Sequence, residues 1–132
     1  METEKENFDK LPDAELDVMM VLWNNREPMK TSSILAVLNR EKNWSISTLQ
    51  ALLSRLNDRG FIGAKTERRL KYYYPLIRKD EYSIKESKSF LRKLHGNSFK
   101  SLVVSLIDGD AIDDADLAEI EEMLRTAGGR DA

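Results

Sequence analysis

The most informative part of the chain is segment 44–75, which reads WSISTLQALLSRLNDRGFIGAKTERRLKYYYP. Its first half predicts a helix from about Ser45 to Arg59, because apolar residues recur there at the spacing of one helical face. These residues are Leu49, Leu52, Leu53 and Leu56. Ser45 is suited to cap the start of this helix, and Gly60 is suited to the left-handed conformation that ends many helices.

The period of the sequence changes after this helix. Residues 61–67 and 70–74 predict two strands, and a short basic turn at Arg68 and Arg69 separates them. A short first strand near Met29 would complete the sheet. A helix followed by a basic hairpin is typical of a winged-helix domain.

Two further helices are expected upstream. The first begins near Pro12, and its apolar stripe is formed by Leu16, Met19, Met20 and Trp23. The second is capped by Thr31 or Ser32, and its inward residues are Ile34, Leu35 and Leu38. Three helices and two strands in this order predict a winged helix-turn-helix domain over residues 11–77.

The outward face of the third helix is polar and fits the major groove of DNA. Gln50 can form paired hydrogen bonds with adenine, and Ala51 or the methyl group of Thr48 can contact a thymine methyl group. The hydroxyl groups and basic side chains nearby suit phosphates or the minor groove. The candidate DNA-binding residues are Thr31, Ser32, Ser45, Ser47, Thr48, Gln50, Ala51, Ser54, Arg55, Arg68, Arg69 and Lys71.

Each of these residues also has a plainer interpretation. Thr48 and Ser54 are common on solvated helix faces, and Arg55 can pair with Asp58 across one turn. The order of the elements along the chain, more than any single residue, therefore carries the DNA-binding hypothesis.

The charge of the chain is divided between its middle and its end. The formal net charge is −2, but segment 40–78 holds nine basic and three acidic residues, a net charge of +6. Segment 105–132 holds nine acidic and two basic residues, a net charge of −7. Because phosphate binding depends on the local field, this asymmetry favours a domain that meets DNA through the middle of the chain.

The composition argues against several classes of protein. The chain has no cysteine and one histidine, so thiolate metal sites are excluded and no cofactor is expected. No apolar stretch is long enough to span a membrane, and the acidic segment 1–10 does not resemble a secretory signal. We expect a cytoplasmic protein without direct membrane binding, whose residues 1–10 form a disordered lead-in.

The last third of the chain predicts short amphipathic helices. We assign residues 78–127 to a helical dimerisation domain and residues 128–132 to a frayed tail, because such helices bury little core alone. The alternative is that they pack back onto the winged helix. The expected interface residues are apolar and comprise Phe90, Leu91, Leu94, Phe99, Leu102, Val103, Leu106, Leu117, Ile120 and Leu124.

The chain resembles the penicillinase and methicillin-resistance repressors of the BlaI/MecI type. The resemblance rests on A-E-L-D-V-M-x-x-L-W from Ala14 and on W-S-x-x-T-L-x-x-L-L-x-R-L-x-x-x-G from Trp44. It continues through S-F-L-x-K-L-x-G from Ser89, K-S-L-V from Lys100 and E-I-E-E-M-L from Glu119. It implies a homodimeric repressor, mainly α with a small β wing, in which an N-terminal winged helix-turn-helix precedes a C-terminal helical dimerisation domain.

The resemblance also implies how such a repressor is controlled. These repressors bind palindromic double-stranded DNA operators and release them when a membrane-bound sensor protease cuts the C-terminal region. The matching bond joins Ser105 to Leu106, where the best-known members have Asn and Phe, and this departure argues against cleavage there. Ser47, Gln50 and Ala51 replace Lys, Arg and Thr of those members, so the bases recognised should differ.

Two other classes of function remain for comparison. A winged helix can serve as a protein-interaction adaptor without a specific operator. An enzyme is disfavoured, because the chain has no cysteine nucleophile, no phosphate-binding glycine loop and only His95 as a histidine.

Overall fold

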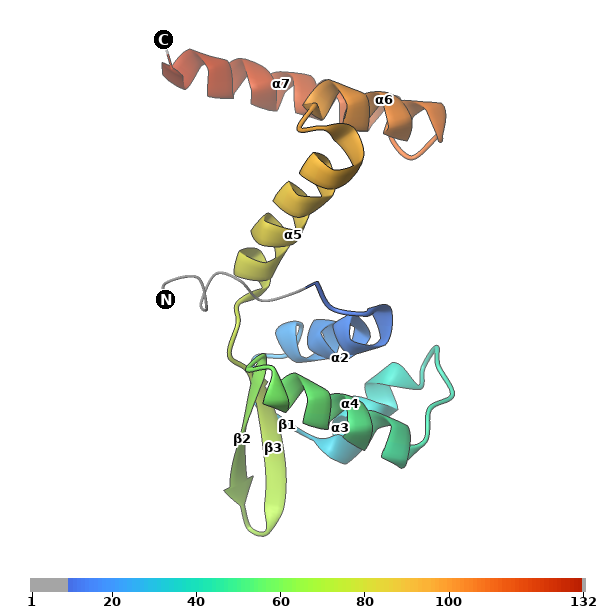
Figure 1. The fold of residues 1–132 in the computed structure, drawn as a ribbon, viewed down its shortest axis with the longest axis vertical. Coiled ribbons are helices and arrows are strands. Elements are labelled where there is room, and N and C mark those ends of the chain that lie inside the picture. The colour runs from blue at the N-terminus through green and yellow to red at the C-terminus, as the bar shows by residue number, and fades with distance from the viewer. Residues whose placement is uncertain (1–9, 132) are drawn as a thin grey trace. The chain divides into compact units, whose positions relative to one another are not determined.

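The computed structural model describes residues 10–131, and side chains of residues 10–127. The chain divides into two compact units, of which the first ends at Ile84 and the second begins at Lys85. Residues 1–9 of the expected lead-in lie outside the described residues. The elements in chain order are α2 (Asp13–Trp23), β1 (Met29–Lys30), α3 (Thr31–Leu38), α4 (Ile46–Asp58), β2 (Ile62–Glu67), β3 (Leu70–Pro75), α5 (Lys79–His95), α6 (Phe99–Asp108) and α7 (Asp114–Asp131) (Figure 1).

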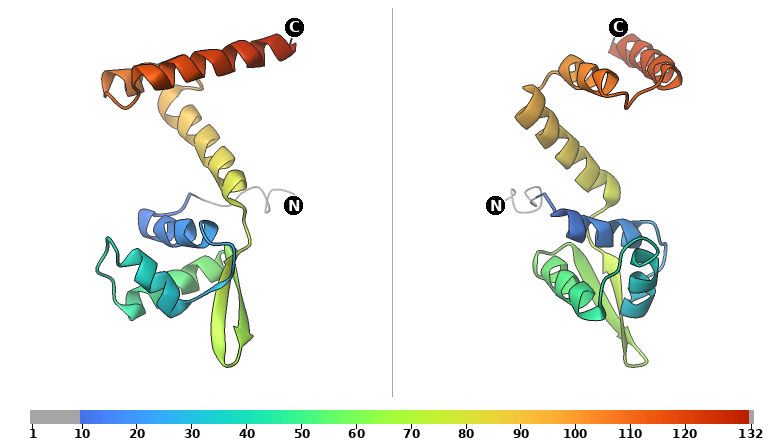
Figure 2. Two further views of the ribbon diagram at one scale, coloured as in Figure 1. Left: turned by 180° about the vertical axis from the view of Figure 1, so that it is seen from behind. Right: turned by 90° about the vertical axis from the view of Figure 1, so that its right-hand side faces the viewer.

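The first unit is a winged helix. Three helices, α2, α3 and α4, pack beside an antiparallel sheet with the strand order β1-β3-β2. The β2–β3 hairpin extends beyond the helices as the wing, as both views of Figure 2 show. This arrangement confirms the predicted fold class and the predicted strand near Met29.

Helix α4 has the boundaries and the buried face that the sequence predicts. Ser45 caps its start by accepting a hydrogen bond from the Thr48 backbone N–H at 3.1 Å. At its end Gly60 has a φ of +80°, and the Phe61 N–H donates to the Leu56 carbonyl at 2.9 Å. These bonds satisfy groups that a helix end otherwise leaves unpaired. All four leucines of the stripe are buried, and each contributes about 1.5–3 kcal/mol of stabilisation.

For the upstream helices one prediction is wrong in part and another is wrong. In α2 the predicted stripe is only partly right: Met19 is buried, and Leu16 and Trp23 are half-buried against the core. The other fully buried side chains of the helix are Glu15, Val18 and Leu22, which the pattern missed. The Glu15 carboxylate can occupy an interior position because Arg59, far along the chain, pairs with it. The buried face of α2 therefore includes a charged residue that an apolar pattern does not predict. In α3 neither Thr31 nor Ser32 caps the helix, since β1 continues directly into α3 and Lys30 is the capping residue without a side-chain bond.

The boundary between the two units lies further along the chain than the predicted position at residues 77/78. Tyr82, in the first turns of α5, is buried in the core of the winged helix. Its hydroxyl accepts a hydrogen bond from the Leu11 backbone N–H at 2.8 Å. Its ring lies 5.8 Å from the ring of Trp23 and 6.1 Å from that of Phe61. These contacts assign the start of α5 to the first unit.

The second unit contains the rest of α5 together with α6 and α7. Gly96 and Asn97 have φ values of +56° and +65° and separate α5 from α6. Ser98 caps α6, and Asp113 accepts the Asp116 backbone N–H at 2.8 Å at the start of α7. Helix α7 continues through residues 128–131, for which a frayed end was predicted.

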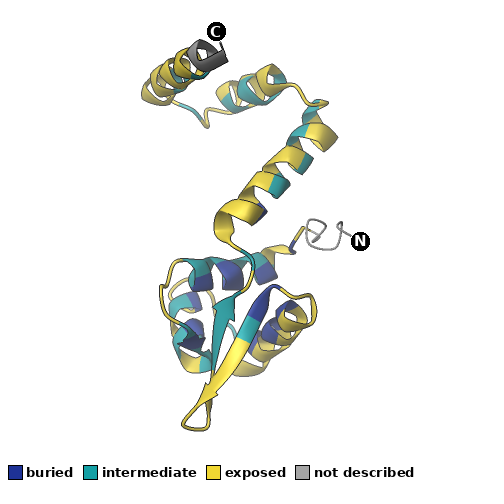
Figure 3. Ribbon diagram, turned by 90° about the vertical axis from the view of Figure 1, so that its left-hand side faces the viewer, coloured by how far each residue is buried: buried dark blue, intermediate teal, exposed yellow. Residues whose placement is uncertain are grey.

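The two units differ in how much apolar surface they bury. All the buried hydrophobic residues of the described chain belong to the first unit. In Figure 3 the helices of the winged helix carry dark blue inner faces, whereas α6 and the described side chains of α7 are teal and yellow. The second unit therefore leaves apolar side chains that a partner surface could cover.

Candidate nucleic-acid interface

The outward face of α4 presents every side chain that the sequence predicts for this helix. Ser47, Thr48, Gln50, Ala51, Ser54 and Arg55 are all exposed, and so is the capping residue Ser45. The alternative pairing of Arg55 with Asp58 is absent from the contacts of the described residues. The guanidinium of Arg55 is therefore available for an external anion.

The hydroxyl groups at the start of α4 form a cluster. Ser45 Oγ lies 3.0 Å from both Ser47 Oγ and Thr48 Oγ1, in addition to accepting the Thr48 N–H. Ser45 is thus engaged as the helix cap, and its hydroxyl group also contacts those of Ser47 and Thr48. Substitution of Ser45 would change the start of the helix as well as any external contact.

A pair of hydrogen bonds between Asn39 and Trp44, which we call the Asn39–Trp44 clamp, fixes the chain just before α4 and was not predicted from the sequence. The Asn39 side chain donates to the Trp44 carbonyl at 3.0 Å and accepts the Trp44 N–H at 2.9 Å. Lys42 Nζ, between them in the sequence, pairs with Asp17 at 3.1 Å and lies 5.7 Å from the centre of the Trp44 ring. The only sequence signal was an asparagine directly after the last leucine of α3. This clamp sets where α4 begins.

A second missed contact holds the other end of α4. Arg59 follows the helix, and its Nη1 lies 3.0 Å from Glu15 Oε1 on α2. The Glu15 side chain is 5 % exposed, and the Arg59 guanidinium also lies 5.4 Å from the centre of the Phe61 ring. Both ends of α4 are therefore held by polar contacts with other parts of the winged helix.

The wing ends in a strained, basic turn. Arg68 and Arg69 both have positive φ values, +52° and +71°, in the two-residue connection between β2 and β3. Asn and Gly usually fill these positions, because a side chain in this conformation costs about 1–2 kcal/mol. Among residues 10–131 no ion pair or hydrogen bond engages either side chain. Lys71, on β3 next to the turn, is exposed as well.

The start of α3 supplies the remaining candidates. Thr31 is half-buried and Ser32 is exposed, at the end of the helix where backbone N–H groups point outward. Such a terminus favours anions. The predicted residues of α3, α4 and the wing therefore all have accessible groups in one unit.

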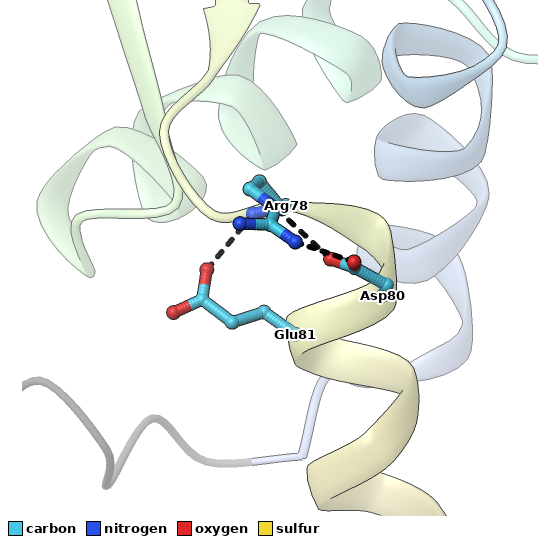
Figure 4. Close-up of polar contacts among 3 residues, drawn as sticks. All are labelled: Arg78, Asp80 and Glu81. Atoms are coloured by element: carbon cyan, nitrogen blue, oxygen red, sulfur yellow. Dashed lines mark hydrogen bonds and ion pairs between the residues drawn. The ribbon is translucent and has the colours of Figure 1, made fainter.

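A polar cluster marks the start of α5. Arg78 donates through Nε to Asp80 Oδ1 at 3.0 Å, and its backbone N–H donates to Glu81 Oε1 at 3.2 Å (Figure 4). The hydrogen bond from Arg78 is the main cause that lowers the pKa of Asp80. The same bond raises the pKa of Arg78. These side chains are exposed, so the cluster orders the surface at the start of α5 without adding to the core.

The residues expected at a dimer interface lie in the second unit and are exposed or half-buried there. Leu94 is 66 % exposed, Leu124 is 53 % and Phe99 is 47 %. Phe90 is also exposed, whereas the half-buried members are Leu91, Leu102, Val103, Leu106, Leu117 and Ile120. Ser105, on one side of the bond that matches the cleavage position of the resembled repressors, is exposed on α6.

Two other kinds of site find no support in the described residues. Residues 10–131 contain no cluster of three metal-ligating side chains. His95 ends α5, and its Nδ1 lies 2.9 Å from Ser101 Oγ, as suits a residue that joins two helices. No helix in the described range combines the length and apolar character needed to cross a membrane.

The fold and the exposed face of α4 define a winged helix-turn-helix protein. The chain belongs to the penicillinase repressor family, which it matches over residues 11–126. This is a family of transcriptional repressors and not of enzymes.

Individual relatives agree with this membership. The methicillin resistance regulatory protein MecI of Staphylococcus aureus strain N315 is 27% identical over 115 residues, which cover 87% of this chain and 93% of that protein. The penicillinase repressor of Bacillus licheniformis is 29% identical over 115 residues, or 87% of this chain and 89% of that protein.

Solved structures match the first unit. The solution structure of the DNA-binding domain of the repressor BlaI superposes with a TM-score of 0.51 at 32% identity, over 58% of this chain and 92% of that chain. The monomeric form of Bacillus licheniformis BlaI in complex with the blaP half-operator superposes with a TM-score of 0.50 at 32% identity, with the same coverage.

Proposed function

We propose that the protein is a homodimeric, sequence-specific DNA-binding repressor that acts on a palindromic operator. The observation that carries the proposal is the exposed polar face of α4 together with the wing tip, whose two arginines have no ion pair or hydrogen bond among the side chains of residues 10–127. The complex of a similar winged helix, that of Bacillus licheniformis BlaI, with a half-operator supports the same use of this surface.

The contacts divide into two roles. Gln50 and Ala51 present groups suited to base edges, whereas Arg55, Arg68 and Arg69 present charges suited to phosphates or the minor groove. Thr31 and Ser32 add phosphate contacts at the start of α3. Because Ser47, Gln50 and Ala51 depart from the residues of the resembled repressors, the operator should differ from theirs.

The homodimer rests on the second unit. Its helices leave large apolar side chains exposed, and a second copy covers them by a two-fold arrangement. Two winged helices then meet two half-sites, which raises affinity and specificity together.

Proteolysis that relieves repression would act on the same unit. Helix α6 buries none of its residues within one chain, so local opening around Ser105 and Leu106 costs little in a monomer. In the dimer the same opening would also expose Leu106 of the interface, so a cut there would weaken association. A membrane-bound sensor protease that cuts there would have to accept Ser-Leu in place of Asn-Phe. Mass spectrometry of the protein from induced cells would detect a fragment that begins at Leu106, and an intact chain after induction would contradict cleavage.

The experiment that tests the proposal is selection of bound sequences from random duplex DNA, with the mass of the same sample measured by light scattering. A two-fold-symmetric site recovered by a dimer is the expected result. A monomer that recovers no preferred sequence would instead favour the protein-interaction adaptor.

A further inference from the structure

A row of three side chains crosses the outer face of the wing sheet. Tyr72 on the central strand β3 pairs with Lys30 on β1 and with Lys65 on β2. Residues directly paired in an antiparallel sheet point to the same face and bring their Cβ atoms within about 5.5 Å. In the row Lys30–Tyr72–Lys65 the tyrosine side chain therefore stands between two lysine side chains.

Burial shows which face this is. The neighbouring row is Met29, Tyr73 and Ala64, of which Met29 is buried in the core and Tyr73 packs against it. Because successive side chains of a strand alternate between faces, the row Lys30–Tyr72–Lys65 points away from the helices.

The next paired position on the outer face is closely packed. Gly63 pairs with Tyr74, and a Cβ added to Gly63 would lie 2.7 Å from the Tyr74 ring. The ring of Tyr74 thus lies against the Gly63 backbone, next to the row Lys30–Tyr72–Lys65 on the same face.

The positive charge of the row is poorly compensated. Among the described residues the Lys30 side chain has no ion pair or hydrogen bond although the residue is half-buried. Lys65 Nζ lies 3.6 Å from Glu67 Oε2, but both side chains are at least half exposed, so this pair contributes little.

The row also joins two parts of the proposed DNA-binding surface. Lys30 directly precedes Thr31 at the start of α3, and Lys65 lies on the strand that leads to Arg68 at the wing tip. A duplex backbone is the partner that matches this continuity and this charge. The alternative is that the two lysines, which lie on the edge strands, serve only to prevent the sheet from pairing with other chains.

We propose that the row Lys30–Tyr72–Lys65 binds the DNA phosphate backbone beside the half-site, and so extends the interface from α3 to the wing. The two ammonium groups contribute charge, and the phenol of Tyr72 donates a hydrogen bond to a phosphate oxygen. The inference rests on the proposed DNA-binding function.

The test measures the affinity of the full chain for its selected site and for a random duplex over a range of salt concentrations. Lys30→Gln and Lys65→Gln should each lower the slope of log affinity against log salt by about 0.9 and weaken binding about 5-fold at 0.15 M salt, on both duplexes. Tyr72→Phe should weaken binding about 2- to 10-fold without changing the slope. Lys88→Gln, an exposed lysine of the second unit, changes the charge equally and should leave the slope unchanged.

Thermal unfolding of each variant shows that the fold is retained. Unchanged slopes for both lysine variants would overturn this inference alone, and increased aggregation with unchanged DNA binding would assign the lysines to edge protection. Failure of the unsubstituted protein to bind any duplex would overturn the proposed function as well.

Discussion

Glu15 and Arg59 form an ion pair that joins the first helix of the winged helix to the end of α4, with 3.0 Å between Glu15 Oε1 and Arg59 Nη1. The carboxylate is almost fully buried, whereas the guanidinium keeps 30 % of its side chain exposed. A buried carboxylate is costly unless it is paired, so this contact fixes both residues.

We expect Arg59→Ala to destabilise the protein by about 1–3 kcal/mol, because it leaves Glu15 buried without its partner. Glu15→Gln should cost less, since a neutral amide is easier to bury. Urea unfolding measures both effects, and the double variant Glu15→Gln with Arg59→Ala should lose less than the sum of the single losses. Additive losses would show that the two residues act independently.

This pair also shows where sequence patterns fail. The leucine stripe and caps of α4 are local signals, and the structure places that helix where the sequence predicts it. The buried position of Glu15 on α2 was missed because its partner lies 44 positions away, and no periodicity reveals that partner. The observed boundary between the units differs from the predicted one for the same reason, because the contact between Tyr82 and Leu11 joins residues 71 positions apart.

For the candidate site, the sequence predicted which side chains are exposed but not the contacts that hold them in place. Helix period and turn residues indicate which side chains of α4 and the wing are exposed, and these are exposed in the structure. The Asn39–Trp44 clamp was missed because asparagine after a helix has many other uses. Which bases each residue contacts depends on DNA geometry, which no sequence pattern encodes.

The turn of the wing should show a conflict between stability and DNA binding. Arg68→Asn with Arg69→Gly relieves two positive φ angles, so the domain should gain about 1–2 kcal/mol in unfolding free energy. The same substitutions remove two charges from the wing tip, so DNA affinity should fall and its salt slope should decrease by up to about 1.8. Arg68→Lys with Arg69→Lys, which keeps the charges, should bind DNA more nearly like the unsubstituted protein. A stabilised double variant with full DNA affinity would show that the wing does not contact DNA.

The exposed face of α4 should divide into residues that discriminate between bases and residues that do not. Arg55→Ala should weaken binding to specific and random duplexes alike, because a phosphate contact is independent of sequence. Gln50→Ala should relax discrimination at one operator position by about 1–3 kcal/mol. Competition binding with operators substituted at single positions measures both. Equal losses for the two variants on every duplex would contradict this division of roles.

The Arg78–Asp80 pair predicts a specific titration behaviour. The hydrogen bond from Arg78 lowers the pKa of Asp80 below its ordinary value of 3.8. The stabilisation from this pair is therefore present above the pKa of the unfolded chain and is lost as pH falls through the lower pKa of the folded protein. Arg78→Gln should raise the pKa of Asp80 toward its ordinary value, as measured by the NMR shift of the Asp80 carboxyl carbon. An unchanged titration would show that the pair does not form in solution.

The exposed leucines of the second unit should be required for association. Leu94 and Leu124 are more than half exposed, and a two-fold interface that covers them buries each residue twice. Leu94→Glu should therefore weaken a dimer by about 3–6 kcal/mol, and Leu124→Glu by a similar amount. Sedimentation equilibrium measures the dissociation constant directly. Lys93→Glu, which alters charge at the exposed position next to Leu94, is the matched control and should remain dimeric. On a two-fold operator the monomeric variants should bind each half-site independently, whereas a dimer that survives both leucine substitutions would place the interface elsewhere.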